Sequence, residues 1–153
     1  MGRVIAISNQ KGGVGKTTTA INLSACLAEK GKRVLTIDMD PQGNTTSGLG
    51  IDKSTVEHTS YQLLTNETTI WEAMTPSIVP GLSVIASERS LAGAEIELIG
   101  FENKEYLLKS KLDMIKDNYD YIIIDCPPSL NLLTINAMTA CLLYTSPSPR
   151  DGL

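Results

Sequence analysis

Short runs of consecutive apolar residues recur along the chain and are separated by stretches in which apolar residues return every three or four positions. Continuous runs such as Val4-Ile5-Ala6-Ile7 are typical of strands that are buried on both faces of a parallel sheet. On this pattern we expect strands at residues 3–8, 33–38, 82–86 and 121–124.

The stretches between these runs predict helices. Ala20, Leu23, Leu27 and Ala28 recur at helical intervals, and Gly31 follows them as a typical C-terminal cap. We expect helices at residues 17–30, 91–98, 102–116 and 130–140, and loops with short helical pieces at residues 41–66. This alternation indicates an α/β fold with a doubly wound, mostly parallel sheet. It opens with a βαβ unit whose crossover should be right-handed.

Composition adds limits on size, class and charge. The chain has 153 residues, enough for one domain with a sizeable core, and 42% hydrophobic with 20% charged residues is ordinary for a soluble globular protein. A net charge of −4 and a pI of about 5.0 give no support for a strongly basic surface that coats DNA. The sequence begins almost directly with a strand and has no signal peptide or long apolar span, so we expect a cytosolic protein.

The cysteines and the larger aromatic residues suggest packing rather than chemistry. Cys26, Cys126 and Cys141 lack the spacing of metal ligands, and we expect Cys26 and Cys126 to be buried, reduced thiols. Tyr61 and Trp71 are expected to be local packing residues.

The segment between the first strand and the first helix carries the strongest chemical signal. Its glycines let successive backbone N–H groups point into one concavity, and the following helix adds its partial positive charge. We expect Lys16 to lie against the β- and γ-phosphates of a nucleotide, the Thr17 hydroxyl to ligate Mg²⁺, and Thr18 to reach the α-phosphate. The expected nucleotide-binding residues are Lys11, Gly12, Gly13, Val14, Gly15, Lys16, Thr17 and Thr18.

This segment departs from the usual phosphate-loop pattern G-x-x-x-x-G-K-[ST], because Gln10 stands where the first glycine would be. The alternative is a glycine-rich turn that binds nothing. Lys11 and Lys16 would repel each other in such a turn without an anion between them, which favours a phosphate site.

Lys11 also carries a family resemblance. The run from Lys11 to Thr17 resembles the deviant Walker A motif, K-G-G-x-G-K-T, of the superfamily of P-loop NTPases that includes ParA, MinD and the nitrogenase iron protein. The resemblance implies a sheet of the P-loop NTPase type. It also implies that Lys11 reaches across an ATP-dependent sandwich dimer to the phosphates of the partner subunit and acts in catalysis with Lys16. The alternative is a solvated loop lysine.

Two aspartates follow the second expected strand. Asp38 and Asp40 stand two residues apart on an extended chain, so both can face a phosphate site at the carboxyl end of the sheet. The run that continues to Asn44 resembles the switch I motif of this superfamily, D-x-D-P-Q-G-N. The resemblance implies that Asp40 positions or activates the attacking water and that Asp38 supports the Mg²⁺ shell. Without it, two aspartates before such a turn would more often be caps and turn formers.

A third aspartate ends the most apolar strand. Asp125 follows Tyr121-Ile122-Ile123-Ile124, which has the form of a Walker B strand whose acid lies beside the metal, usually contacting it through water. Residues 125–129 resemble the switch II motif D-x-P-P-S. The expected metal site therefore comprises Thr17, Asp38 and Asp125, although an acid that merely caps a strand end is common in isolation.

The residues of these motifs resemble those of the ParA/Soj branch of the superfamily, and the resemblance covers about residues 1–140. Asn9-Gln10, residues 40–44, Gly48-Leu49-Gly50 and residues 125–129 all fit that branch. The resemblance implies an ATP- and Mg²⁺-dependent partition ATPase that segregates chromosome or plasmid DNA. Its expected partners are a second copy of itself, non-specific DNA and a ParB-type centromere-binding protein. It would be cytoplasmic and associated with the nucleoid, without stable membrane association.

Two alternatives stay open at this point. A MinD-like membrane-cycling positioning ATPase would show a C-terminal amphipathic helix and usually lacks the Pro-Gln-Gly-Asn run present here. A nucleotide-dependent metal-cluster or reductase subunit would need a paired-cysteine site, which the sequence does not show.

The last residues depart from the family. Family members continue well past this length, so we expect residues 1–140 to be the N-terminal part of a P-loop ATPase domain, truncated before its last strands and inactive or prone to aggregate alone. Residues 141–151 match one reading frame of a common transposase-type sequencing adapter, and we expect residues 141–153 to be non-native. The alternative is a strand that starts at Leu142 and leads into a Pro/Ser linker.

Overall fold

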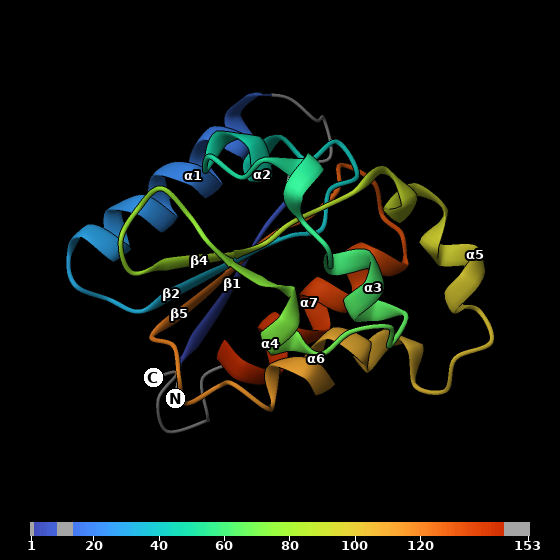
Figure 1. The fold of residues 1–153 in the computed structure, drawn as a ribbon. Helices are drawn as coiled ribbons and strands as arrows, with labels where there is room; N and C mark the ends of the chain where they lie inside the picture. The colour runs from blue at the N-terminus through green and yellow to red at the C-terminus, as the bar shows by residue number, and fades with distance from the viewer. Residues whose placement is uncertain (1, 9–13, 146–153) are drawn as a thin grey trace, which may run out of the picture.

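A computed structural model describes residues 2–8 and 14–145, and in this part of the chain a five-stranded sheet separates two layers of helices (Figure 1). The strand order is β1-β5-β2-β4-β3, and every neighbouring pair is parallel except β3 with β4. The strands are β1 (Arg3–Ile7), β2 (Val34–Asp38), β3 (Met74–Pro76), β4 (Leu82–Ile85) and β5 (Tyr121–Asp125). The predicted α/β fold with a mostly parallel sheet is confirmed.

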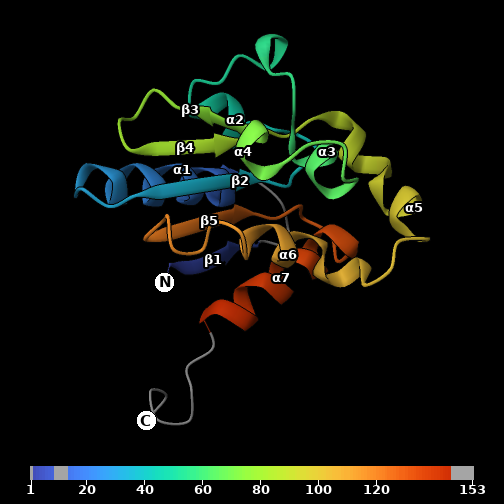
Figure 2. The same ribbon diagram turned by 60° about the horizontal axis from the view of Figure 1, so that its bottom comes forward.

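Strand β5 lies between the first two strands of the chain, as Figure 2 shows. The two strands of the expected βαβ unit are therefore parallel but not adjacent, because β1 and β2 each pair with β5. In this register Ile7 and Asp38 both lie opposite Asp125. The carboxyl ends of three strands consequently meet at one edge of the sheet, where ligands bind in open α/β folds.

Each face of the sheet has its own apolar core, because successive side chains of a strand point to opposite faces. Ile123 packs in one core with the residues of α1 (Val14–Glu29), whereas Ile122 and Ile124 pack in the other with α6 (Leu107–Leu112) and α7 (Leu132–Thr145). Figure 1 shows α1 and α2 (Asn44–Gly48) on one side of the sheet and α4 (Ile70–Ala73), α6 and α7 on the other. The doubly wound arrangement follows from this burial on both faces.

The remaining helical segments are short and connect the strands. They are η1 (Lys53–Thr55), α3 (Ser60–Leu64), η2 (Arg89–Gly93), α5 (Ala94–Leu98) and η3 (Lys104–Tyr106). No helix among the described residues combines the length and the apolar character needed to cross a bilayer.

Two helices differ most from their expected bounds. The helix expected at residues 102–116 does not start until η3, because Asn103 adopts a left-handed backbone with φ 53°, and its α-helical part, α6, ends at Leu112. Helix α7 continues to Thr145, five residues beyond the expected end at residue 140. The alternative of a strand starting at Leu142 is therefore wrong.

Two elements were not expected at all. Strand β3 pairs antiparallel with β4 at the edge of the sheet and has three residues, one of them Pro76. A proline has no backbone N–H to donate to the hydrogen bonds between strands, so within sheets it is confined to edge strands. Its presence also makes a strand hard to predict from the sequence. Helix α4 has four residues and is fixed by a capping box between Thr69 and Glu72 rather than by an apolar period.

The prediction for Cys26 was wrong, whereas Cys126 is buried as expected. Helix α1 turns Ala20, Ser24 and Ala28 into the core at intervals of four. Cys26 lies two positions from both Ser24 and Ala28, about 200° around the helix, and is exposed. Burial raises the pKa of the Cys126 thiol to about 12, so this thiol stays protonated.

Candidate nucleotide site

Three predicted aspartates meet at the carboxyl edge of the sheet. Asp38 ends β2 and lies opposite Asp125, which ends β5, while Asp40 follows two residues beyond β2. Their exposed fractions are 0% for Asp38, 6% for Asp40 and 1% for Asp125. Carboxylates are almost never buried to this degree unless they are paired or bind a ligand.

Lys16 points into this cluster from the first turn of α1 and is itself only 4% exposed. Its Nζ donates to Asp40 Oδ2 at 3.0 Å and also to Asp125 Oδ1. Burial, the largest single effect, lowers the pKa of this ammonium, but the hydrogen bonds and charges of Asp125 and Asp40 outweigh burial and raise the pKa overall. Lys16 is therefore a fixed cation inside the site.

Asp38 is held differently, by hydrogen-bond donors without a charge. Its Oδ2 accepts from the backbone N of Thr46 at 2.9 Å and from the Thr46 hydroxyl at 2.6 Å, and its Oδ1 accepts from the backbone N of Asp40 at 3.1 Å. Burial raises the pKa of Asp38 to about 6, the Thr46 hydroxyl opposes this shift, and the charge of Asp125 adds to it.

Hydroxyl groups that the sequence analysis missed complete the site. The Thr45 hydroxyl donates to Asp125 Oδ2 at 2.6 Å, and the Ser60 hydroxyl donates to the backbone carbonyl of Asp38 at 2.8 Å. The backbone N of Ser87 donates to the Thr46 hydroxyl at 3.1 Å, while the Ser87 hydroxyl donates to the backbone carbonyl of Asp40. Ser87 lies just past β4, so the rule that ligands bind at the carboxyl ends of strands could have found it.

Gly43 makes the sharp turn that brings α2 over the aspartates. Its φ of 67° is left-handed, its N donates to the carbonyl of Asp40 at 2.9 Å, and α2 begins at the next residue. A Cβ at this position would lie 2.4 Å from Lys53 Nζ. Glycine is the residue that adopts this backbone without cost, which explains its place in the run from Asp38 to Asn44.

The phosphate loop itself is only partly within the described residues. Lys11, Gly12 and Gly13 lie outside them, and α1 begins at Val14. Gly15 and Thr18 are exposed and Thr17 is partly exposed, whereas Lys16 between them is buried. The first backbone N–H groups of a helix have no intrahelical partner and attract anions.

The chemistry of the cluster fits a divalent cation. Three buried carboxylates lie at this edge of the sheet with one buried ammonium, which pairs with Asp40 and Asp125, so an excess of two negative charges is left when all are ionised. No group of three or more His, Cys, Asp or Glu side chains among the described residues converges as a complete metal site. Mg²⁺ usually takes only one or two carboxylates and completes its shell with water and phosphate oxygens. Asp38, Asp125 and the Thr17 hydroxyl supply oxygen donors of the right kind.

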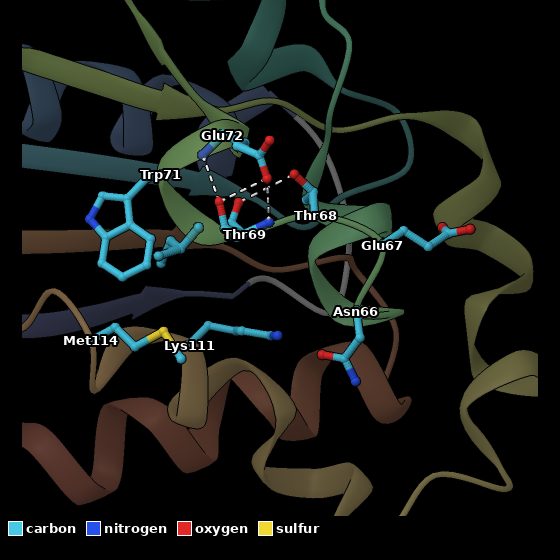
Figure 3. A pocket seen from close by; sticks show the side chains of 9 residues that line it. Asn66, Glu67, Thr68, Thr69, Trp71, Glu72, Lys111 and Met114 are labelled. Carbon is cyan, nitrogen blue, oxygen red and sulfur yellow. Dashed lines mark hydrogen bonds between the residues drawn. The ribbon is translucent and has the colours of Figure 1, made fainter.

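A separate cavity of about 370 Å³ lies between α4 and α6, and Figure 3 shows its lining. Trp71 and Met114 stand at one side of it and Asn66 at the other. None of its lining residues belongs to the carboxylate cluster. Trp71 is 54% exposed, whereas Tyr61 packs against the core as expected.

Comparison with known proteins places this arrangement in a family. A family model described as an AAA domain matches residues 2–145. The chain is 59% identical over 140 residues to the sporulation initiation inhibitor protein Soj of Bacillus subtilis (strain 168), covering 92% of this chain and 55% of that protein. It is 53% identical over 140 residues to the chromosome partitioning protein ParA of Myxococcus xanthus (strain DK1622), covering 92% and 50%. The chain thus spans about half the length of these relatives.

Solved structures share the fold. One is cobyrinic acid a,c-diamide synthase from Mycobacterium smegmatis with a bound ATP analog and magnesium, at a TM-score of 0.87 and 41% identity, covering 92% of this chain and 57% of that one. Another is a plasmid partition protein from Borrelia burgdorferi, at a TM-score of 0.81 and 34% identity, covering 92% and 62%. The P-loop NTPase type of the sheet is confirmed by these similarities.

Proposed function

Because the chain belongs to the AAA-domain family whose model spans residues 2–145, we propose that it forms the nucleotide-binding part of a Mg²⁺-dependent ATPase that partitions chromosome or plasmid DNA. The observation that carries the proposal is the buried contact of Lys16, at the start of α1, with two carboxylates at the ends of the strands. A buried lysine at a helix N-terminus that faces an excess of acids is arranged to exchange carboxylates for phosphates.

In the proposed reaction a water attacks the γ-phosphate of ATP. Asp40 orients this water, and its carboxylate is available for that role once Lys16 turns toward the phosphates. Lys16 and the α1 amides stabilise the negative charge that develops in the transition state. Bound Mg²⁺, held by Thr17, Asp38 and Asp125, would neutralise charge on the β- and γ-phosphates.

The proposal includes the assembly implied by the ParA/Soj resemblance. Lys11 would act across a nucleotide-dependent homodimer, together with the other nucleotide-binding residues from Gly12 to Thr18. The ATP-bound dimer would bind DNA without sequence preference, and a ParB-type protein would stimulate hydrolysis and release. Relatives at 59% and 53% identity carry the names Soj and ParA, which supports this function and a cytoplasmic, nucleoid-associated location.

Two other functions compete with partition. A MinD-like positioning ATPase would cycle on membranes, and the Pro-Gln-Gly-Asn run after Asp40 argues against it. The solved cobyrinic acid a,c-diamide synthase, at 41% identity, raises ATP-dependent amide synthesis as a second candidate. The higher identity to Soj and ParA favours partition over amide synthesis.

The test uses the complete product of the gene that encodes this sequence. We expect Mg²⁺-dependent ATP hydrolysis that rises on adding DNA together with a ParB-type partner, and not on adding cobyrinic acid with a nitrogen donor. Lys16→Ala should abolish hydrolysis, and Lys11→Ala should abolish ATP-dependent dimerisation in sedimentation experiments while leaving ATP binding measurable. Wild-type protein that binds no ATP, or that hydrolyses it independently of Lys16, would contradict the proposal.

The division of the chain belongs to the same proposal: residues 1–140 form the ATPase part, and residues 141–153 are non-native. The genomic sequence of the parent gene tests this division directly. If the codons for residues 141–153 are present there in frame, the division is wrong.

A further inference from the structure

Thr46 is buried completely, and its hydroxyl both donates and accepts a hydrogen bond within the site. Its hydroxyl donates to Asp38 Oδ2 at 2.6 Å and accepts from the backbone N of Ser87 at 3.1 Å, while its own backbone N donates to the same Asp38 oxygen at 2.9 Å. One residue thus supplies two of the three hydrogen bonds that hold this carboxylate.

Asp38 differs in this respect from its two neighbours in the cluster. Asp40 and Asp125 both pair with Lys16, but within residues 2–8 and 14–145 no ion pair engages Asp38. Three neutral donors fix its carboxylate without neutralising it. Because no cation of the described residues pairs with it, this carboxylate is open to a cation that arrives with the nucleotide.

Ser87 connects Thr46 to a third strand. This uncharged residue follows β4. Its backbone N donates to the Thr46 hydroxyl, and its own hydroxyl donates to the backbone carbonyl of Asp40. The position of α2, and with it Thr46, is therefore set by the carboxyl ends of β2 and β4 together.

From these contacts we infer that Thr46 is a positioning residue for the metal shell, which orients Asp38 toward Mg²⁺ by a hydrogen bond from its hydroxyl. This inference rests on the proposed function, in which Asp38 supports that shell. Hydrogen-bond partners of metal-shell ligands set ligand orientation, and their loss costs about 10–100-fold in metal affinity.

Mn²⁺ in place of Mg²⁺, with a non-hydrolysable ATP analogue, provides a probe that does not depend on turnover. We expect Thr46→Val, which keeps the shape but removes the hydroxyl, to raise the Mn²⁺ dissociation constant about tenfold by electron paramagnetic resonance. Thr46→Ser keeps the hydroxyl and should stay within about twofold of wild type. Metal-free affinity for the analogue should change less than about twofold in both variants, because the inferred role concerns the metal alone.

Thr36 offers a matched control. Its hydroxyl is equally buried in β2 and donates to Ser24 Oγ at 2.7 Å, without contact to the carboxylates. Thr36→Val therefore removes a buried hydroxyl of the same kind and should leave Mn²⁺ affinity unchanged, even if it lowers stability. If Thr46→Val does not fold, Thr46→Ala makes the same deletion with a smaller group that lets water replace the hydroxyl.

The outcomes separate the two proposals. If wild-type protein binds the Mn²⁺–nucleotide complex no more tightly than Thr46→Val and Thr46→Ala do, the nucleotide site stands but the hydroxyl contributes nothing to it, and the role of Thr46 is overturned. A loss in Thr46→Ser as large as in Thr46→Val, or an equal loss in Thr36→Val, would also overturn it. Wild-type protein that binds neither nucleotide nor metal would instead refute the proposed function.

Discussion

Strands β2 and β5 carry charged residues at both of their ends, and the two ends are built in opposite ways. At the amino end, Arg33 and Asp120 form one exposed pair, with Arg33 Nη2 3.1 Å from Asp120 Oδ1 and side-chain exposures of 60% and 36%. At the carboxyl end, Lys16 lies buried among Asp38, Asp40 and Asp125. The exposed ion pair joins one cation to one anion, whereas the buried cluster has one cation for three anions.

This difference separates a structural ion pair from a binding site. An exposed pair costs little to form and contributes little, because water screens both partners. A buried cluster with unbalanced charge costs free energy, since each ion has lost its hydration and repels its like-charged neighbours. Such a cluster is retained where a ligand compensates it, which is why buried, perturbed acids mark functional sites.

Removal of the buried cation should have the largest effect. We expect Lys16→Met, made in the complete gene product like the variants below, to lower the free energy of unfolding by about 3 kcal/mol, because it leaves buried carboxylates without a counter-charge. ATP hydrolysis should fall at least about a hundredfold. Urea unfolding and phosphate release measure the two effects. Lys30→Met, at an exposed position just past the end of α1, is the control. A stability loss in Lys16→Met no larger than that in Lys30→Met would contradict the prediction.

The two ends should also respond to pH in opposite directions. The pKa of Asp38 is raised by burial to about 6, so the folded state holds this proton more tightly than the unfolded chain does. Stability contributed by protonated Asp38 is present below the ordinary pKa of about 4 and is lost as pH rises through 6, by about 3 kcal/mol in total. Urea unfolding in a metal chelator from pH 4 to 7 should show this slope in wild type relative to Asp38→Asn. Parallel pH profiles of the two proteins would contradict the prediction.

Removal of one buried anion should have a much smaller effect on stability than removal of the cation. Asp40→Asn leaves Lys16 paired with Asp125 and relieves repulsion among the carboxylates, so the free energy of unfolding should stay within about 1 kcal/mol of wild type. Hydrolysis should still be lost if Asp40 orients the water. If Asp40→Asn lowered the free energy of unfolding as much as Lys16→Met does, the cluster would behave as a simple ion pair, and the prediction would be wrong.

The exposed pair should show the smallest effect, with the opposite pH dependence. Hydrogen bonds from the Arg33 side chain and backbone lower the pKa of Asp120 to about 2. Its stabilisation is therefore present above the ordinary pKa of about 4 and is lost as pH falls toward 2. Asp120→Asn should lower the thermal midpoint slightly at pH 7 and not at pH 2, while Asp117→Asn, an exposed neighbour, should change it at neither pH. A midpoint drop that persists at pH 2 would contradict this account.

The buried parallel strands of the sheet were predicted closely, whereas the short elements near its edge were not. Strands β1, β2 and β5 were expected within one residue or so of their observed bounds, because buried parallel strands are continuous apolar runs. Strand β3 and helix α4 were missed, because three or four residues are too few to show a repeating spacing of apolar residues. The end of α6 at Leu112 was also missed, since the apolar spacing continues to Ile115.

The candidate site shows the same division. Lys16 and the aspartates at 38, 40 and 125 could be predicted, since motif spacing and strand ends identify them, and the structure brings them together. The hydroxyls of Thr45 and Thr46 could not be singled out, because threonine is common in loops and serves turns as often as sites. Ser87 was missed although its place just past β4 could have indicated it.

By itself, then, the order of residues determined which groups exist and which strand or helix end each one follows, because local apolar patterning and glycine turns act over a few neighbours. Only the tertiary structure decided that β5 enters between β1 and β2 and places Asp125 opposite Asp38, and that α2 turns Thr46 onto one acid while Lys16 pairs with the other two. Those choices depend on strand order and on burial in a low-dielectric interior, which are properties of residues far apart in the chain.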